Sequence, residues 1–262
     1  MTIVKHELKM NFKSLIIWTT TIGSMIFAFM LMFPMLEDSL SQMGDMYSSM
    51  GGFSAAFGLD KLAMNTPMGY YGTEVGAMLS LGGALFGALL GVGIISKEEG
   101  GHTAEFLLSA PVNRAKVVLQ KLLAMLINIV VFDLVCMLLA LLSFALISGE
   151  IDARGFMLYH LAQFFMHLEI ACICFCISAF FKKTNAGLGL GIAIILYFLD
   201  IMVKTITNIE FLKYITPFYY AGAADIISSG KIDIVLLGIG IMVIILSAMV
   251  AIVKYAKKDI VA

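Results

Sequence analysis

KEEGGHTAEFLLSAPVNR, residues 97–114, separates two long apolar segments of the chain. This stretch is charged, yet it has a helical pattern of its own, because apolar residues recur at three- and four-residue spacing. These residues are Ala104, Leu107, Leu108 and Pro111. The pair Gly100-Gly101 can separate this helix from the preceding apolar segment, and Pro111 can end it. The stretch is therefore predicted to be a short helix that lies outside the membrane and joins two membrane-spanning helices.

The rest of the chain is strongly apolar. Of its 262 residues, 61% are hydrophobic and only 13% are charged, and the mean hydropathy is +0.98. A soluble protein carries about twice this fraction of charge. Apolar runs recur that are long enough to cross a hydrocarbon layer of roughly 30 Å. This composition predicts an all-α, polytopic integral membrane protein. The net charge of −1 gives no indication of nucleic-acid binding, and the four Cys lie in apolar runs, which argues against disulfides.

Six membrane spans are predicted, over residues 15–36, 73–95, 115–147, 156–181, 186–205 and 232–255. A basic amphipathic helix over residues 1–14 is expected to lie in the membrane interface and lead into the first span, which is retained. Residues 37–72 are too polar to span and are expected to form a loop. The third span would measure about 50 Å as a helix, so it must project beyond the bilayer at its charged end.

The distribution of Lys and Arg gives the orientation. With six spans, both termini lie on one side, together with twelve of the 17 basic residues: Lys5, Lys9, Lys13, Lys97, Arg114, Lys116, Lys121, Lys182, Lys183, Lys254, Lys257 and Lys258. The opposite side has the remaining five: Lys61, Arg154, Lys204, Lys213 and Lys231. Because basic residues are retained in the cytoplasm, the richer side is predicted to be cytoplasmic. Residues 97–114 then form a cytoplasmic loop between the second and third spans.

The order of residues in this loop resembles a motif of the ABC-2 type permeases, the membrane subunits of many bacterial ABC exporters. The matching positions are Glu98, Gly101, Thr103, Glu105, Leu107, Leu108, Pro111 and Arg114. The chain departs from the motif at His102, which separates a Gly and a Thr that are adjacent in the family. The resemblance also covers the basic amphipathic start, the six spans and the long first outer loop.

The resemblance implies that residues 1–262 form one permease domain in the bacterial cytoplasmic membrane. Residues 97–114 would be a coupling helix that docks into a groove of a separate ATPase. The coupling residues would be Glu98, Thr103, Glu105, Leu107, Leu108, Pro111 and Arg114.

The chain has no G-x-x-x-x-G-K-[ST] sequence, so it lacks the loop that cradles nucleotide phosphates. ATP and Mg²⁺ would therefore be bound by the partner ATPase, and no catalytic, cofactor or metal site is predicted on this chain. Six spans are few for a complete transport path. Both facts favour a complex of two permease and two ATPase subunits surrounded by membrane lipid. Whether the two permeases are identical is left open.

Three acidic residues fall within predicted spans. Charges inside a membrane are costly and usually face a cavity or a partner, so Asp133, Glu169, His167 and Asp200 are candidates for a translocation path. The alternative is structural, for example a buried pair of Asp133 with His167 on the neighbouring span. A metal site is disfavoured because no H-E-x-x-H sequence occurs.

Two other classes of function compete with the exporter interpretation. A proton-coupled secondary carrier would use Asp133, Glu169 and Asp200 and would need no ATP. An intramembrane hydrolase would need a converging nucleophile or metal set, which the sequence does not offer. The many Met and Phe residues suit a hydrophobic or amphipathic cargo, such as a peptide, an antibiotic or a lipid-like molecule.

Glycine repeats every four residues in two spans, at Gly83, Gly87 and Gly91 and at Gly187 and Gly191. Such stripes allow close helix packing. The contact could be made within one chain or between two copies, and the sequence does not distinguish these cases.

Overall fold

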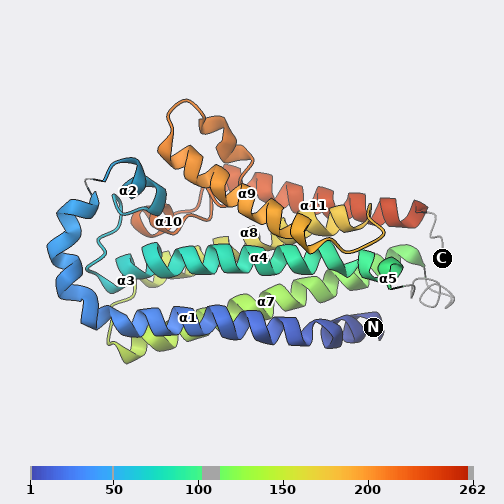
Figure 1. Cartoon of the computed structure of the whole chain (residues 1–262), viewed down its shortest axis with the longest axis horizontal. Coiled ribbons are helices and arrows are strands. Elements are labelled where there is room, and N and C mark those ends of the chain that lie inside the picture. Colours follow the sequence, from blue (N-terminus) through green and yellow to red (C-terminus); the bar gives the residue numbers. More distant parts are fainter. Residues whose placement is uncertain (1, 49, 102–112, 259–262) are drawn as a thin grey trace.

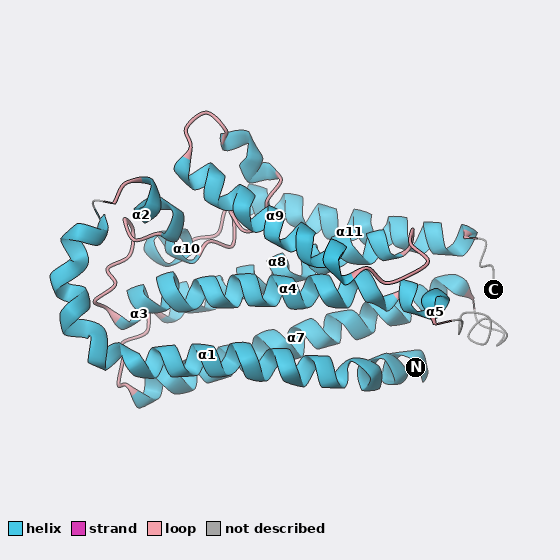
Figure 2. Ribbon diagram, in the orientation of Figure 1, coloured by secondary structure: helices cyan, strands magenta, loops and turns pink. Residues whose placement is uncertain are grey.

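The computed structural model describes residues 2–48, 50–101 and 113–258, and all regular secondary structure in these ranges is helical (Figure 2). Six helical stretches are long and apolar enough to cross a membrane, which confirms the predicted all-α, six-span class. They are α1 (Thr2–Ser48), the continuous run of α3 (Pro67–Tyr70), η1 (Tyr71–Val75) and α4 (Gly76–Ile94), then α7 (Arg114–Leu146), α8 (Ala153–Ser178), α9 (Ala186–Thr205) and α11 (Ile234–Lys257). The shorter helices are α2 (Gly52–Phe57), α5 (Ser96–Gly100), η2 (Glu210–Tyr214) and α10 (Ala223–Ser229).

The first helix differs from the prediction. Residues 2–14 and the expected first span form one unbroken helix, and α1 continues past Leu36 to Ser48, so the expectation of a loop from residue 37 is wrong over residues 37–48. Polarity indicates that a segment leaves the apolar layer, but it does not by itself end a helix. Pro34 lies inside α1, and Figure 1 shows this helix bending at its far end. A proline removes one backbone hydrogen bond and is a usual cause of such a bend.

Side-chain caps define where four of the long helices begin. Asn113, Asp152, Asn185 and Asp233 each accept a hydrogen bond from a backbone N–H in the first turn of α7, α8, α9 and α11, respectively. These caps satisfy donors that have no partner within the helix. They therefore set the starting residues of helices whose apolar pattern alone leaves the boundary open.

Helix α4 lies at the centre of the bundle. It packs mainly against α8 and also contacts α9 and α1, while α1 runs along α7 and α11 lies against α8 and α7 (Figure 1). The N-terminus, the C-terminal end of α11 and α5 all lie at the same end of the bundle (Figure 1). Large apolar side chains on the outer face of α7, such as Leu134, Leu138 and Leu142, are exposed. This surface suits contact with lipid.

The glycine stripe of α4 packs within the chain. A Cβ atom added at Gly83 would overlap the His167 ring, and one at Gly91 would overlap the carbonyl oxygen of Ala171, both on α8. In α9, a Cβ atom at Gly191 would meet no other atom within 4 Å. The α4 stripe therefore allows α4 and α8 to approach closely, whereas Gly191 faces open space.

This difference predicts opposite effects of two matched substitutions. Gly91→Ala should lower the free energy of unfolding by roughly 1–3 kcal/mol, because the new methyl group has no room against α8. Gly191→Ala should be neutral or slightly stabilising, because alanine favours helix and the site is open. Thermal unfolding of both variants in detergent checks this. Equal stability of the two variants would contradict the packing described here.

Candidate functional site

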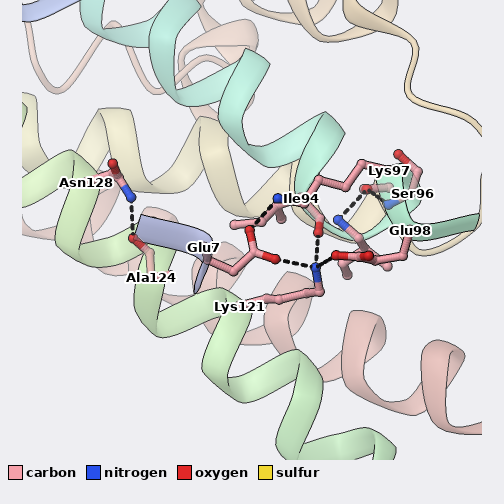
Figure 3. Close-up of polar contacts among 10 residues, drawn as sticks. Glu7, Ile94, Ser96, Lys97, Glu98, Lys121, Ala124 and Asn128 are labelled. Atoms are coloured by element: carbon pink, nitrogen blue, oxygen red, sulfur yellow. Dashed lines mark hydrogen bonds and ion pairs between the residues drawn. The ribbon is translucent and has the colours of Figure 1, made fainter. Parts of the chain in front are cut away.

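A buried ion network lies at the end of the bundle where α1 begins and α4 ends. At its centre is Lys121 of α7, whose side chain is 1% exposed. Its Nζ atom donates hydrogen bonds to Glu7 Oε1 at 2.6 Å, to the carbonyl oxygen of Ile94 at 2.7 Å and to Glu98 Oε1 at 2.8 Å (Figure 3). An ammonium group has three hydrogens to donate. All three are used, so this one side chain links α7 to α1, α4 and α5.

Glu7 of α1 connects a second lysine to the network. Its Oε2 atom accepts a hydrogen bond from Lys97 Nζ at 2.5 Å, and its side chain is as buried as that of Lys121. Two ammonium groups therefore face the carboxylates of Glu7 and Glu98, and the formal charges balance. Buried charges are tolerated in proteins when they are paired and hydrogen-bonded in this way.

Helix α5 is also linked to α8 and α11. Glu99 forms an ion pair with Lys258 at 2.6 Å, and Lys258 Nζ donates to the carbonyl oxygen of Phe181 at 2.9 Å. Arg114, at the start of α7, donates to the carbonyl oxygen of Lys258 at 2.7 Å. The hydroxyl oxygen of Ser178 on α8 accepts hydrogen bonds from the backbone N–H groups of Ile95 and Ser96, at 3.3 and 3.0 Å.

These contacts involve both ends of the segment that the sequence predicts to be the coupling helix. Glu98 and Glu99 lie near the start of this segment, residues 97–114, and Arg114 is its last residue; Glu98 and Arg114 are among the predicted coupling residues. The other five predicted coupling residues lie outside the described part of the structure: Thr103, Glu105, Leu107, Leu108 and Pro111. The structure therefore describes how both ends of the segment attach to the bundle.

Sequence reasoning missed Glu7, Lys97, Lys121 and Lys258 as site residues, because it counted the lysines only as topology signals. Two signals could have found them. Glu7 is an acid among the basic residues of the amphipathic start, and Lys121 follows the apolar residues that begin the third span. An isolated charge in such a setting usually has a specific partner.

The polar residues inside the spans form separate pairs. Asp133 Oδ1 of α7 lies 2.8 Å from His167 Nδ1 of α8, and both side chains are buried. This is the structural pair that the sequence left open. Tyr71 OH and His160 Nε2 form a second buried hydrogen bond of 2.8 Å, between η1 and α8.

Glu169 and Asp200 have other partners. The hydroxyl of Tyr220 donates to Glu169 Oε2 at 2.9 Å, and burial together with the nearby Glu169 raises the pKa of Tyr220 well above its usual value, so it remains a donor. Lys204 Nζ donates to Asp200 Oδ2 at 2.6 Å. The structure thus brings Asp133 and His167 together, but it does not join these residues to Glu169 or Asp200 by any hydrogen bond among the described residues.

These features define a multi-pass helical membrane protein whose charged end holds a segment between two long spans. A family model described as ABC-2 family transporter protein matches residues 1–260, and the chain belongs to this family. It is therefore a permease, the membrane subunit of an ABC transporter. Permeases of this family are generally non-catalytic and work with an ABC ATPase. A comparison with curated protein sequences gave no match.

The network predicts that Lys121 has a large effect on stability. Lys121→Met should lower the free energy of unfolding by roughly 3–5 kcal/mol, because Glu7 and Glu98 would be left with too little positive charge in a buried site. Lys116→Met removes an exposed lysine from the same helix and should change stability by less than about 0.5 kcal/mol. Thermal unfolding in detergent measures both.

A double variant tests whether the effect comes from the ion pairs. Glu7→Gln combined with Lys121→Met should lose less stability than the sum of the two single variants, because each already removes the same interaction. Strict additivity would show that Lys121 acts through packing of its aliphatic stem alone and not through these charges.

Proposed function

We propose that this chain is the permease of an ATP-driven exporter in which residues 97–114 couple a separate ATPase to the membrane helices. The observation that supports this most directly is that both flanks of residues 102–112 are attached to the charged end of the bundle. On the side of α5, Glu98 and Glu99 make the contacts, and on the side of α7 Arg114 makes them. A force applied to the segment between them would act on several helices at once.

The proposed transmission follows these contacts. Movement of the segment would displace α5 and the first turns of α7. Lys121 and Glu7 would carry this displacement to α1, Ser178 to α8 and Lys258 to α11. Hydrogen bonds between charged groups in a buried site are strong, so these ends should move as a unit. The expected result is a tilt of α4 and α7 that opens a path toward the outside.

The exporter would contain two permeases and two ATPase subunits in the bacterial cytoplasmic membrane. The end that carries the network would face the cytoplasm, in keeping with the excess of Lys and Arg there. ATP and Mg²⁺ would bind to the ATPase subunits, and this chain would catalyse no covalent step. The cargo would be hydrophobic or amphipathic and would leave the cell.

We further propose that the polar residues within the spans influence the path of this cargo. Asp200 is the member of the predicted set that lines an open polar cavity, together with Lys204 and the ion pair of Lys61 with Asp225. Asp133 lines a shallow apolar groove between α7 and α8. His167 and Glu169 would act by holding Asp133 and Tyr220 in position.

The coupling proposal predicts the effect of reversing one charge. Glu105→Arg should leave membrane insertion intact but reduce co-purification with the ATPase, or uncouple ATP hydrolysis from transport, because it would place like charges against a basic groove. Leu108→Asp should act similarly by placing a charge at an apolar contact. The matched control is Glu210→Arg, which reverses an exposed acid in η2, the short helix after α9, and should behave as wild type.

Normal co-purification and normal transport by Glu105→Arg and Leu108→Asp would remove the segment from the mechanism. The purified chain alone should hydrolyse no ATP. Stoichiometric hydrolysis by the chain without a partner would refute the permease assignment, and transport driven by a proton gradient in the absence of ATP would favour the secondary carrier.

If these residues influence the cargo path, variants that remove their charge should change transport without a large change in stability. Asp133→Asn and Glu169→Gln retain an oxygen that accepts a hydrogen bond, so each should stay within about 1 kcal/mol of the wild type while preference for cationic cargo falls. Asp133→Leu leaves His167 without this partner and should cost about 1–3 kcal/mol. Thermal unfolding and a transport assay measure the two effects. If both amide variants lost several kcal/mol, these residues would be scaffold and not path.

A further inference from the structure

A groove of about 540 Å³ opens between α1, α2, η1–α4 and α9. Most of its walls are apolar, with Trp18 of α1, Phe53 and Phe57 of α2 and Met78 of α4 among them. Glu74 is the only charged residue that lines this groove in the described part of the chain. It lies in the π-helical turn η1, where the second span begins.

Glu74 is half-buried, and no residue in the described part of the chain provides it with a counter-ion. It forms no hydrogen bond or ion pair with any residue in the described ranges 2–48, 50–101 and 113–258. A carboxylate at the wall of an apolar groove makes an unfavourable contact with a purely apolar ligand. It makes a favourable contact with a ligand that carries a positive charge, because the low local dielectric strengthens the attraction between the two charges.

A second, polar cavity adjoins the groove. The two share four lining residues: Phe57, Thr73, Ala77 and Tyr197. The polar cavity contains the ion pairs of Lys61 with Asp225 and of Lys204 with Asp200, whose formal charges cancel. Asp200 is only 5% exposed, and its Oδ1 atom is buried without a hydrogen-bond partner among the described residues. A buried acceptor of this kind is costly unless a ligand or solvent donates to it.

We propose that the groove and the polar cavity together form a binding site for a cationic amphiphile. Its apolar chain lies against Trp18, Phe53 and Phe57, its positive charge pairs with Glu74, and a donor on its polar end reaches Asp200 Oδ1. This inference names the substrate class for the proposed exporter and so rests on that function, but binding itself requires neither the ATPase nor transport.

The chain provides its own reporter for this site. It contains one tryptophan, and this residue, Trp18, lines the groove. The full-length chain in phosphatidylcholine nanodiscs would be titrated with a primary ammonium amphiphile that carries a dibrominated twelve-carbon chain, because its N–H groups can donate to Asp200 and bromine quenches tryptophan fluorescence on contact. Sulfate and maltoside amphiphiles with the same brominated chain serve as anionic and neutral probes.

We expect saturable quenching of Trp18 by the ammonium probe, reversed by its unbrominated counterpart. Glu74→Gln should shift the midpoint to about tenfold or higher concentration, which is the size expected for a lost contact with a charged group. Glu150→Gln, an exposed acid in the connection between α7 and α8, should leave the midpoint unchanged. Ala77→Phe should abolish saturable quenching by filling the space where the two cavities meet.

Three results would overturn the proposal: equal midpoints for the ammonium and sulfate probes, an unchanged midpoint in Glu74→Gln, or quenching that rises without saturation as the probe enters the bilayer. The comparison of probes uses the wild-type chain and does not depend on the folding of any variant. Co-purification with the ATPase in the same preparations separates the two questions, since the exporter assignment could hold while this cargo class fails.

Discussion

A lysine ammonium with no access to water must be surrounded by acceptors, and this requirement organises the charged end of the molecule. Lys121 meets it with Glu7, Glu98 and the carbonyl oxygen of Ile94, which belong to three different elements. Removing a charged group from water costs several kcal/mol per ion. The attraction between the paired charges offsets this cost only when the geometry of the pairs is close to ideal. The start of α1, the end of α4, α5 and the first turns of α7 therefore have little freedom to move independently.

The two ends of the bundle are built on different principles. At the end with the network, charged side chains join helices across the bundle, and the flanks of residues 102–112 belong to this joined unit. In the middle, α4 and α8 approach closely because glycines leave no side chain between them. Toward the other end, α1, α2 and α9 line a groove that their side chains do not fill. A permease needs both properties, since one end must receive force and another part must admit cargo.

The sequence predicts the six spans because apolar runs report directly on partition into lipid. It fails at α1, where the polar residues after Leu36 remain helical, since helix continuation depends on backbone hydrogen bonding and not on polarity. It also identifies Asp133 with His167 as a possible pair, because their helices are adjacent in the chain. The role of Lys121 could not be predicted from neighbouring segments of the sequence. Its partners, Glu7 and Glu98, come from separate segments, and only the packing of the helices brings them together.

The absence of a side chain at Gly83 limits which residues positions 167 and 133 can hold in this chain. The missing side chain leaves room for the His167 ring, and that ring holds the Asp133 carboxylate at 2.8 Å. A larger residue at 83 would require a smaller one at 167, and the acid at 133 would then be stranded in the apolar interior. Residues on three helices are thus coupled through the His167 ring, whose position depends on the small residue at 83 and in turn fixes the partner of the acid at 133.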